Sequence, residues 1–223
     1  GRFAYELEQR HHNVLCLRGR CYQRESVPYK ALDGVMDQLT DYLSGRRPLE
    51  VEGLMPRNVS ALAQLFGVLQ KVPAVQRARS RGGDASGTNR RARAALRELF
   101  GRLADRRSVV LLIDDLQWGD ADSAMLLAEL LRAPDPPALL LVGSYRTEDA
   151  ASSPLLERLK TFRESAIVGL ETHELALQPL TGDAARELAR RLLQSAGRPT
   201  DLADRIAEEA GGSPLFIREL VYW

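Results

Sequence analysis

Two adjacent carboxylates, Asp114 and Asp115, directly follow an apolar run at residues 109–113. A short apolar run of this kind, rich in β-branched residues, predicts a buried strand. The two acids then stand at the carboxyl end of that strand, where open parallel sheets bind their ligands. Carboxylate oxygens suit Mg²⁺, which completes its shell with substrate phosphates. The pair therefore predicts a metal and phosphate site, and the alternative is a buried strand that ends in a polar turn.

Around this run, strand-like and helix-like patterns alternate along the chain. Buried-strand patterns lie at residues 13–17, 109–114, 138–145 and 174–177. Amphipathic helix patterns lie at residues 28–45, 92–105, 125–131 and 154–163, and Asp120 is placed to cap the third of these helices. Strands that alternate with helices indicate parallel crossovers. We therefore expect an α/β fold, with a parallel sheet and helices on both of its faces.

The pattern changes to helices alone near the end of the sequence. Thr181 is placed to cap a helix that runs to about Ser195, and further helices are expected at residues 201–210 and from Pro214 onward. We predict an α/β core over residues 1–178 and a small helical, lid-like subdomain over residues 179–223.

A polar stretch at about residues 76–91 is rich in glycine and arginine. We interpret it as a mobile loop. The alternative is a basic contact for phosphate or nucleic acid, but no aromatic residues are interleaved for base stacking.

Composition bears on which partners and which compartment the protein has. The 223 residues carry a formal net charge of +1, so overall charge gives no argument for a nucleic-acid or membrane partner. We find no apolar run long enough to span a bilayer and no signal peptide. The two cysteines, Cys16 and Cys21, are expected to be reduced thiols in a cytoplasmic protein. The sequence opens without Met and ends inside a helix-like stretch, so we expect it to be cut from a longer chain.

Three features together indicate a family. They are the Asp-Asp-Leu-Gln-Trp-Gly-Asp block at residues 114–120, the polar residues 144–147 after the next strand, and Gly212-Ser213-Pro214 in the helical part. Together they resemble the AAA+/STAND group of P-loop ATPases, and the 109–115 segment resembles a Walker B strand. Residues 19–34 look like the copies fused behind a bacterial serine/threonine kinase domain. The resemblance covers essentially the whole chain and implies a P-loop NTPase-like fold.

The resemblance also implies roles for single residues. Asp114 would hold Mg²⁺, and Asp115 would lie near the γ-phosphate of ATP and polarise the attacking water. Arg146 would be a sensor of the γ-phosphate, a task that its forked guanidinium suits, and Ser144 is a weaker sensor candidate. Gly212 and Pro214 match the family's Gly-x-Pro, where proline packs near the adenine. The plainer alternatives are a surface arginine and an ordinary turn between helices.

One departure from the family pattern matters for activity. A P-loop enzyme needs G-x-x-x-x-G-K-[ST] to hold phosphates, and the sequence contains no Gly-Lys pair. By the resemblance, this loop and the first, central strand lie just upstream of Arg2 and Phe3. We therefore expect this segment alone to bind ATP poorly and to be inactive as an ATPase.

These observations lead to one functional prediction and two alternatives. We predict an ATP-binding and hydrolysing regulatory switch of a larger bacterial signal-transduction protein, with ATP and Mg²⁺ as cofactors. An attached kinase or effector domain is the expected partner, self-association is left open, and no membrane or nucleic-acid partner is expected. The alternatives are a non-catalytic interaction scaffold with a degenerate nucleotide site and a DNA-associated ATPase.

Overall fold

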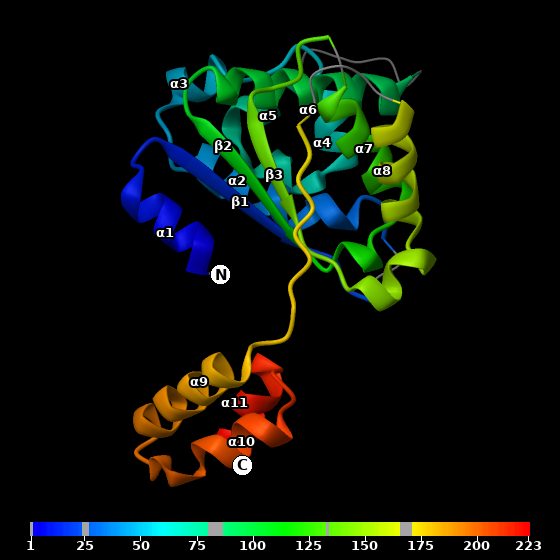
Figure 1. The fold of residues 1–223 in the computed structure, drawn as a ribbon. Helices are drawn as coiled ribbons and strands as arrows, with labels where there is room; N and C mark the ends of the chain where they lie inside the picture. The colour runs from blue at the N-terminus through cyan, green and yellow to red at the C-terminus, as the bar shows by residue number, and fades with distance from the viewer. Residues whose placement is uncertain (1, 24–26, 80–86, 133, 166–170) are drawn as a thin grey trace. The chain divides into compact units, whose positions relative to one another are not determined.

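Three parallel strands form the sheet that positions the two acids (Figure 1). The computed structural model describes residues 2–23, 27–79, 87–132, 134–165 and 171–223. Within them the strand order is β1-β2-β3, with β1 at Val14–Arg20, β2 at Ser108–Asp114 and β3 at Leu139–Gly143. Strands expected at 13–17, 109–114 and 138–145 are thus confirmed. Because all three run in parallel, their carboxyl ends meet at one edge of the sheet.

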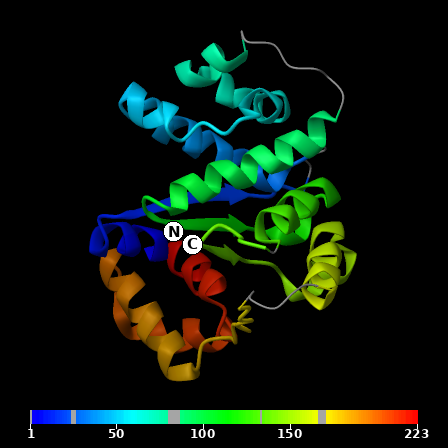
Figure 2. The ribbon, with the colours of Figure 1, turned by 90° about the horizontal axis from the view of Figure 1, so that it is seen from above.

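Most of the core lies on one face of this sheet. The inward-facing residues of β1 and β2, among them Leu17 and Leu111, pack against helices that include α2 (Lys30–Ser44), α6 (Thr88–Ala104) and α7 (Ala121–Leu131). On the opposite face, α1 (Arg2–Arg10) packs Ala4 against Cys16 and Val110 (Figure 2). The expected α/β fold, with a P-loop NTPase-like parallel sheet between helices, is therefore confirmed.

Further helices complete this part of the chain. They are α3 (Pro48–Glu52), α4 (Val59–Leu65), η1 (Gly67–Lys71), α5 (Pro73–Arg79), η2 (Leu116–Trp118), η3 (Thr147–Ser152) and α8 (Pro154–Ser165). The loop expected at about 76–91 is shorter than predicted, since α5 and α6 occupy both ends of that range. Its middle, residues 80–86, lies outside the described residues.

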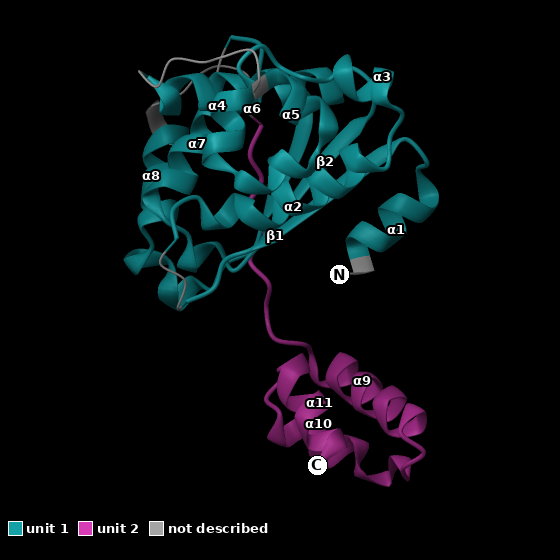
Figure 3. Cartoon of the chain, turned by 180° about the vertical axis from the view of Figure 1, so that it is seen from behind, with its two compact units in different colours: residues 1–170 teal, residues 171–223 magenta. Residues whose placement is uncertain are grey.

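The chain divides into two compact units (Figure 3), which we call unit 1 (Gly1–Leu170) and unit 2 (Glu171–Trp223). Unit 2 holds α9 (Gly182–Ser195), η4 (Thr200–Leu202), α10 (Ala203–Glu209) and α11 (Pro214–Tyr222). Its small core is formed by residues that include Ala189, Leu193, Ile217 and Val221. The Thr181 hydroxyl accepts a hydrogen bond from the Ala184 amide, so the predicted cap of α9 is confirmed.

The strand expected at residues 174–177 is wrong. This segment has no strand assignment, and its backbone forms no ladder with another described strand. Its two leucines face solvent, with Leu175 86% and Leu177 94% exposed. A period-two pattern forms a strand only where the segment pairs with a neighbouring strand, and no described strand pairs with this segment.

The last strand of the described sheet, β3, has an exposed face and an unpaired edge. On β3, Leu140 and Val142 are 49% and 37% exposed, although both are large and apolar. In the described sheet β3 pairs only with β2, so its other edge carries unpaired backbone donors and acceptors.

Two smaller expectations concern the environment of the protein. Cys16 and Cys21 are both buried, and neither forms a disulfide. None of the helices in the described part of the chain combines the length and apolarity that crossing a bilayer requires.

Candidate functional site

Asp114 closes β2, and its carboxylate lies next to the neighbouring strand. The Ser144 hydroxyl, one residue past the end of β3, donates a hydrogen bond of 2.8 Å to Asp114 Oδ1. The backbone brings them together, because the Ser144 amide donates to the Ile113 carbonyl and the Leu116 amide donates to the Ser144 carbonyl. Asp114 is exposed, so a ligand can reach its carboxylate from solvent.

Asp115 takes an unusual backbone conformation. Its φ of 58° and ψ of 42° lie in the left-handed region, which aspartate tolerates better than most residues. This turn points the chain from β2 into η2. A non-glycine residue in this region costs about 1–3 kcal/mol, which the surrounding structure must offset.

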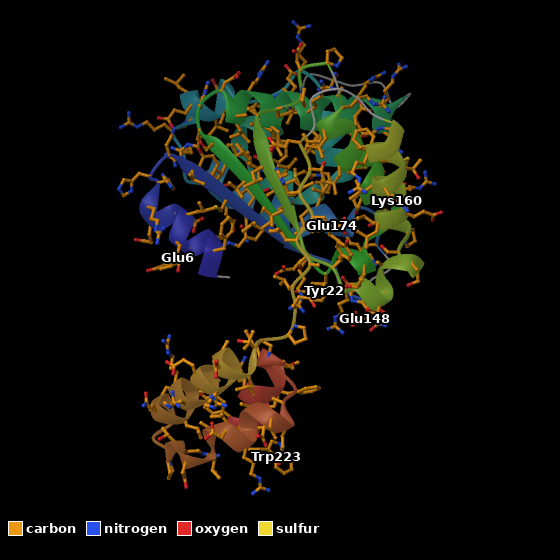
Figure 4. The ribbon with its side chains drawn as sticks, in the orientation of Figure 1. Glu6, Tyr22, Glu148, Lys160, Glu174 and Trp223 are labelled. Atoms are coloured by element: carbon orange, nitrogen blue, oxygen red, sulfur yellow. The ribbon has the colours of Figure 1, made fainter. Side chains whose placement is uncertain are left out.

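Two donors hold the Asp115 carboxylate, one on each oxygen. Arg20, the last residue of β1, places its Nε and Nη2 at 2.9 Å from Asp115 Oδ2. The buried Gln117 donates from Nε2 to Asp115 Oδ1 at 3.1 Å. The Arg20 guanidinium also lies 5.6 Å from the centre of the Tyr22 ring. Figure 4 labels Tyr22 and Glu148, which follow β1 and β3 at this end of the sheet.

Sequence reasoning missed Arg20 and Gln117. The signal that could have revealed Arg20 is its place at the carboxyl end of the strand that neighbours β2, where the register sets Arg20 opposite Asp114. Gln117 lies inside the acidic block, two residues from Asp115, but its burial could not be inferred from that spacing alone.

Asp120, the last acid of the block, joins two helices. Its side chain caps α7 by accepting from the Ser123 amide at 2.7 Å and the Ser123 hydroxyl at 2.6 Å, so the predicted cap is confirmed. It also accepts from the Tyr29 and Lys30 amides at the start of α2, at 3.2 and 3.1 Å. Burial alone would raise the pKa of the Asp120 carboxyl. The hydrogen bonds from Ser123 and Tyr29 outweigh it and lower that pKa below its usual value.

A family model described as AAA ATPase domain matches residues 1–142, which is more than half of the chain and includes β1, β2 and the acidic block. The chain belongs to the AAA ATPase domain family. No curated protein and no solved structure gave a significant match.

The AAA ATPase match gives the acidic edge a chemical context. The family generally uses ATP and Mg²⁺, and membership indicates a nucleotide-dependent module. The residues present fit a Mg²⁺ ion, because Mg²⁺ takes one or two carboxylates and completes its shell with water and substrate phosphates. Asp114 offers an exposed carboxylate for this purpose. No group of three or more His, Cys, Asp and Glu residues that could hold a metal occurs among the residues described.

The other predicted site residues of this AAA ATPase domain lie apart from the two acids in sequence. Arg146 is exposed at the start of η3, and its backbone amide donates to Gln117 Oε1 at 3.2 Å. It therefore connects to Asp115 through Gln117. Gly212 and Pro214 belong to unit 2, where Ser213 caps α11 and Pro214 is its first residue.

Gly212 has a clear reason to be glycine. Its φ is 79°, and a Cβ there would overlap the Leu180 carbonyl oxygen and crowd Pro179. The Leu180 amide donates to the Gly212 carbonyl at 2.8 Å, which ties the chain before α9 to the turn before α11. This backbone contact explains the glycine without a ligand, as the plainer alternative from the sequence suggested.

Proposed function

We propose that this AAA ATPase domain is the body of an ATP-driven regulatory switch. The observation that carries the proposal is the pairing of Asp114 and Asp115 at the carboxyl edge of a parallel sheet. There Ser144 fixes the first acid, and Arg20 and Gln117 hold the second. Ligands of such sheets bind at this edge, and phosphoryl transfer depends on positioned charges at this kind of site.

Each residue at the carboxyl ends of the strands has one proposed task. Asp114 holds Mg²⁺, and Ser144 fixes the rotamer of its carboxylate from β3. Asp115 orients and polarises the water that attacks the γ-phosphate, and Arg146 contacts that phosphate as a sensor. When bound, Mg²⁺ would neutralise charge on the phosphate oxygens. The contacts of the two acids support their tasks, whereas the task of Arg146 rests on the family resemblance and on its place after β3.

We further propose that the phosphate-binding loop and one more strand lie upstream of Gly1. Two observations support this. The sequence contains no Gly-Lys pair, which a P-loop requires. The outer edge of β3 is unpaired among the described strands, as expected of a strand that lacks a neighbour.

The helical part and the parent protein complete the proposal. Residues 179–223 act as a lid whose Gly212 and Pro214 lie near the adenine, and the nucleotide state repositions this lid in a hinge-type switch. The module is of the STAND type, in the cytoplasm of a bacterium, and transmits its state to an attached kinase or effector domain. The compact helical core of unit 2 supports its acting as one body.

ATP binding by two chains tests the proposal. Residues 1–223 alone are expected to bind a fluorescent ATP analogue at least about tenfold more weakly than a chain extended upstream through the proposed loop. The reason is that backbone amides and a lysine of the loop supply the main phosphate contacts. Sequencing about sixty codons upstream of Gly1 comes first. Tight, Mg²⁺-dependent binding by residues 1–223 would contradict the proposal, as would an upstream sequence without G-x-x-x-x-G-K-[ST].

A second candidate is a scaffold that keeps the fold without nucleotide chemistry. One observation favours it: both oxygens of Asp115 already accept hydrogen bonds, from Arg20 and Gln117. A carboxylate that polarises water needs a free lone pair. The Arg20–Asp115 ion pair must therefore leave one lone pair of Asp115 free, or break during ATP hydrolysis. A carboxylate has about four lone-pair positions, so the hydrogen bonds from Arg20 and Gln117 leave room for a water.

The substitution Arg20→Gln tests whether the Arg20 contact restrains the Asp115 carboxylate. The pair is partly exposed, with the Arg20 side chain at 59% and the Asp115 side chain at 21%, so the contact contributes at most about 1 kcal/mol. If it restrains Asp115 in a resting position, the substitution in the extended chain raises basal ATP hydrolysis, by up to about fivefold. Steady-state phosphate release measures this.

Arg18→Gln is the matched control for that experiment. Arg18 lies on the same strand, but its guanidinium pairs with Glu8 of α1 at 2.9 Å, so its loss should leave hydrolysis unchanged. A fall in hydrolysis for Arg20→Gln alone would show that Arg20 assists the reaction rather than restraining Asp115.

A further inference from the structure

A second cluster of charge surrounds a cavity at the opposite end of the sheet. The cavity has a volume of about 260 Å³ and lies between the end of α2, the region of α3 and the end of α6. Arg107 lines it and directly precedes β2, whereas Asp114 closes that strand. Six residues of β2 lie between Arg107 and Asp114, a span of about 23 Å along the strand. The cavity is therefore distinct from the proposed nucleotide site at the carboxyl ends of the strands.

Three arginines line this cavity: Arg46, Arg106 and Arg107. The guanidinium carbons of Arg46 and Arg107 lie 4.7 and 5.5 Å from the centre of the Tyr42 ring, so cation–π contacts with Tyr42 hold both cations beside the cavity. Arg106 is held by a different contact, because its Nη1 donates a hydrogen bond of 3.2 Å to the Glu50 backbone carbonyl. The three guanidiniums are thus anchored around one hollow.

These cations are not neutralised by ion pairs. Within the described part of the chain none of the three forms a salt bridge, whereas Arg77, Arg102 and others do. The one carboxylate that lines the cavity is that of Glu50, so three positive charges face one negative charge. Like charges gathered without partners repel, and an anion that accepts from two or more guanidiniums would relieve this.

The inner wall of the cavity is apolar. Leu54 and Leu103 line it, and they are 3% and 1% exposed. A ligand for this place combines a small apolar body with a group of high negative charge. A phosphate has more charge and more acceptor oxygens than a carboxylate, which suits several guanidiniums at once. The volume is smaller than that of most drug-sized pockets, which restricts the body to a few atoms or one ring.

We propose that this arginine-lined cavity binds a small phosphate monoester with an apolar body. The site is independent of the nucleotide edge and of the proposed function. The competing explanation is that the arginines only stabilise the ends of α2 and α6, since positive charge is favourable at a helix C-terminus.

Titration of residues 1–223 with phenyl phosphate, followed by NMR, tests this proposal. The probe is expected to bind with a dissociation constant near 1 mM or tighter, and at least about tenfold more tightly than inorganic phosphate or phenol alone. Shift changes are expected at Leu54, Leu103 and Tyr42. A free phosphate as the natural ligand would instead give equal affinity for phenyl phosphate and inorganic phosphate, which would overturn the need for an apolar body.

Substitutions make the test specific. The double variant Arg46→Gln, Arg107→Gln should weaken phenyl phosphate binding at least about tenfold, and Arg10→Gln, an exposed arginine on α1, should not. Circular dichroism melting checks that the double variant is folded. The double variant Arg46→Lys, Arg107→Lys keeps the charge but loses the forked donors, so it should bind phenyl phosphate more weakly than the wild type and more tightly than the double glutamine variant. Absence of saturable binding by the wild type, or shift changes at Asp114 and Ser144 instead, would overturn the proposal.

Discussion

Replacing Asp115 by asparagine is expected to slow ATP hydrolysis by about a hundredfold or more, because a positioned carboxylate that polarises a reacting water is worth that much. The chain for this experiment is the extended one, which carries the proposed phosphate-binding loop. ATP binding should stay within about threefold of the wild type, since the acid acts on the water and not on the bound phosphates. Single-turnover hydrolysis and analogue binding, measured side by side, separate the two effects.

Asparagine suits this substitution for structural reasons. It occupies the left-handed backbone region that Asp115 requires more readily than other residues do. It keeps a side-chain oxygen that can accept from Arg20 or Gln117, so the turn after β2 should remain in place. A loss of activity would then reflect the missing charge rather than a rebuilt loop.

Two further variants sharpen this prediction. Asp37→Asn removes an exposed carboxylate on α2, away from the edge, and should leave both hydrolysis and binding unchanged. Asp114→Asn should weaken Mg²⁺-dependent ATP binding, because Asp114 is the proposed ligand of the ion. Hydrolysis that survives Asp115→Asn at more than about half of the wild-type rate would show that another group polarises the attacking water, whereas an extended wild-type chain with no hydrolysis at all would favour the scaffold.

The sheet and its acids could be predicted because their signals are local. An apolar run that ends in two acids identifies β2, and its neighbours β1 and β3 show the same short apolar pattern. The caps of α7 and α9 were also local, since Asp120 and Thr181 each accept a hydrogen bond from a residue three positions ahead. In each case a single segment carries both the pattern and the reason for it.

The features that were missed depend on distant segments. The Arg20–Asp115 contact joins residues 95 positions apart, and only the register of β1 against β2 brings them together. The segment at 174–177 failed for the converse reason: its pattern is that of a strand, but no described strand pairs with it. The local sequence pattern makes a segment able to form a strand, but the segment forms one only when a neighbouring strand pairs with it.

Asp120→Ala is expected to lower the free energy of unfolding by about 3 kcal/mol, more than the loss of an ordinary helix cap. The reason is that one carboxylate serves two helices. Its removal leaves the Ser123 amide and hydroxyl at the start of α7, and the Tyr29 and Lys30 amides at the start of α2, without their acceptor. Tyr29, the residue before α2, makes no side-chain cap of its own, so Asp120 performs this task from a distant loop.

Urea unfolding of residues 1–223 measures this loss, and Asp122→Ala is the matched control. Asp122 lies in the same first turn of α7, so its loss removes a favourable charge at the helix N-terminus and should cost at most about 1 kcal/mol. Equal losses for the two variants would show that Asp120 acts only as a local charge and not as the link between α7 and α2.

The same link predicts a dependence on pH. Because the pKa of Asp120 is lowered in the folded protein, its ionised form stabilises the fold. This contribution is fully present above the ordinary aspartate pKa of about 3.9 and is lost as the pH falls through the lower, folded value. The stability difference between wild type and Asp120→Asn should therefore be constant from neutral pH down to about pH 5, and should shrink below about pH 4. A difference that stays constant to pH 2 would mean that the charge of Asp120 contributes nothing and that its oxygens act only as neutral acceptors.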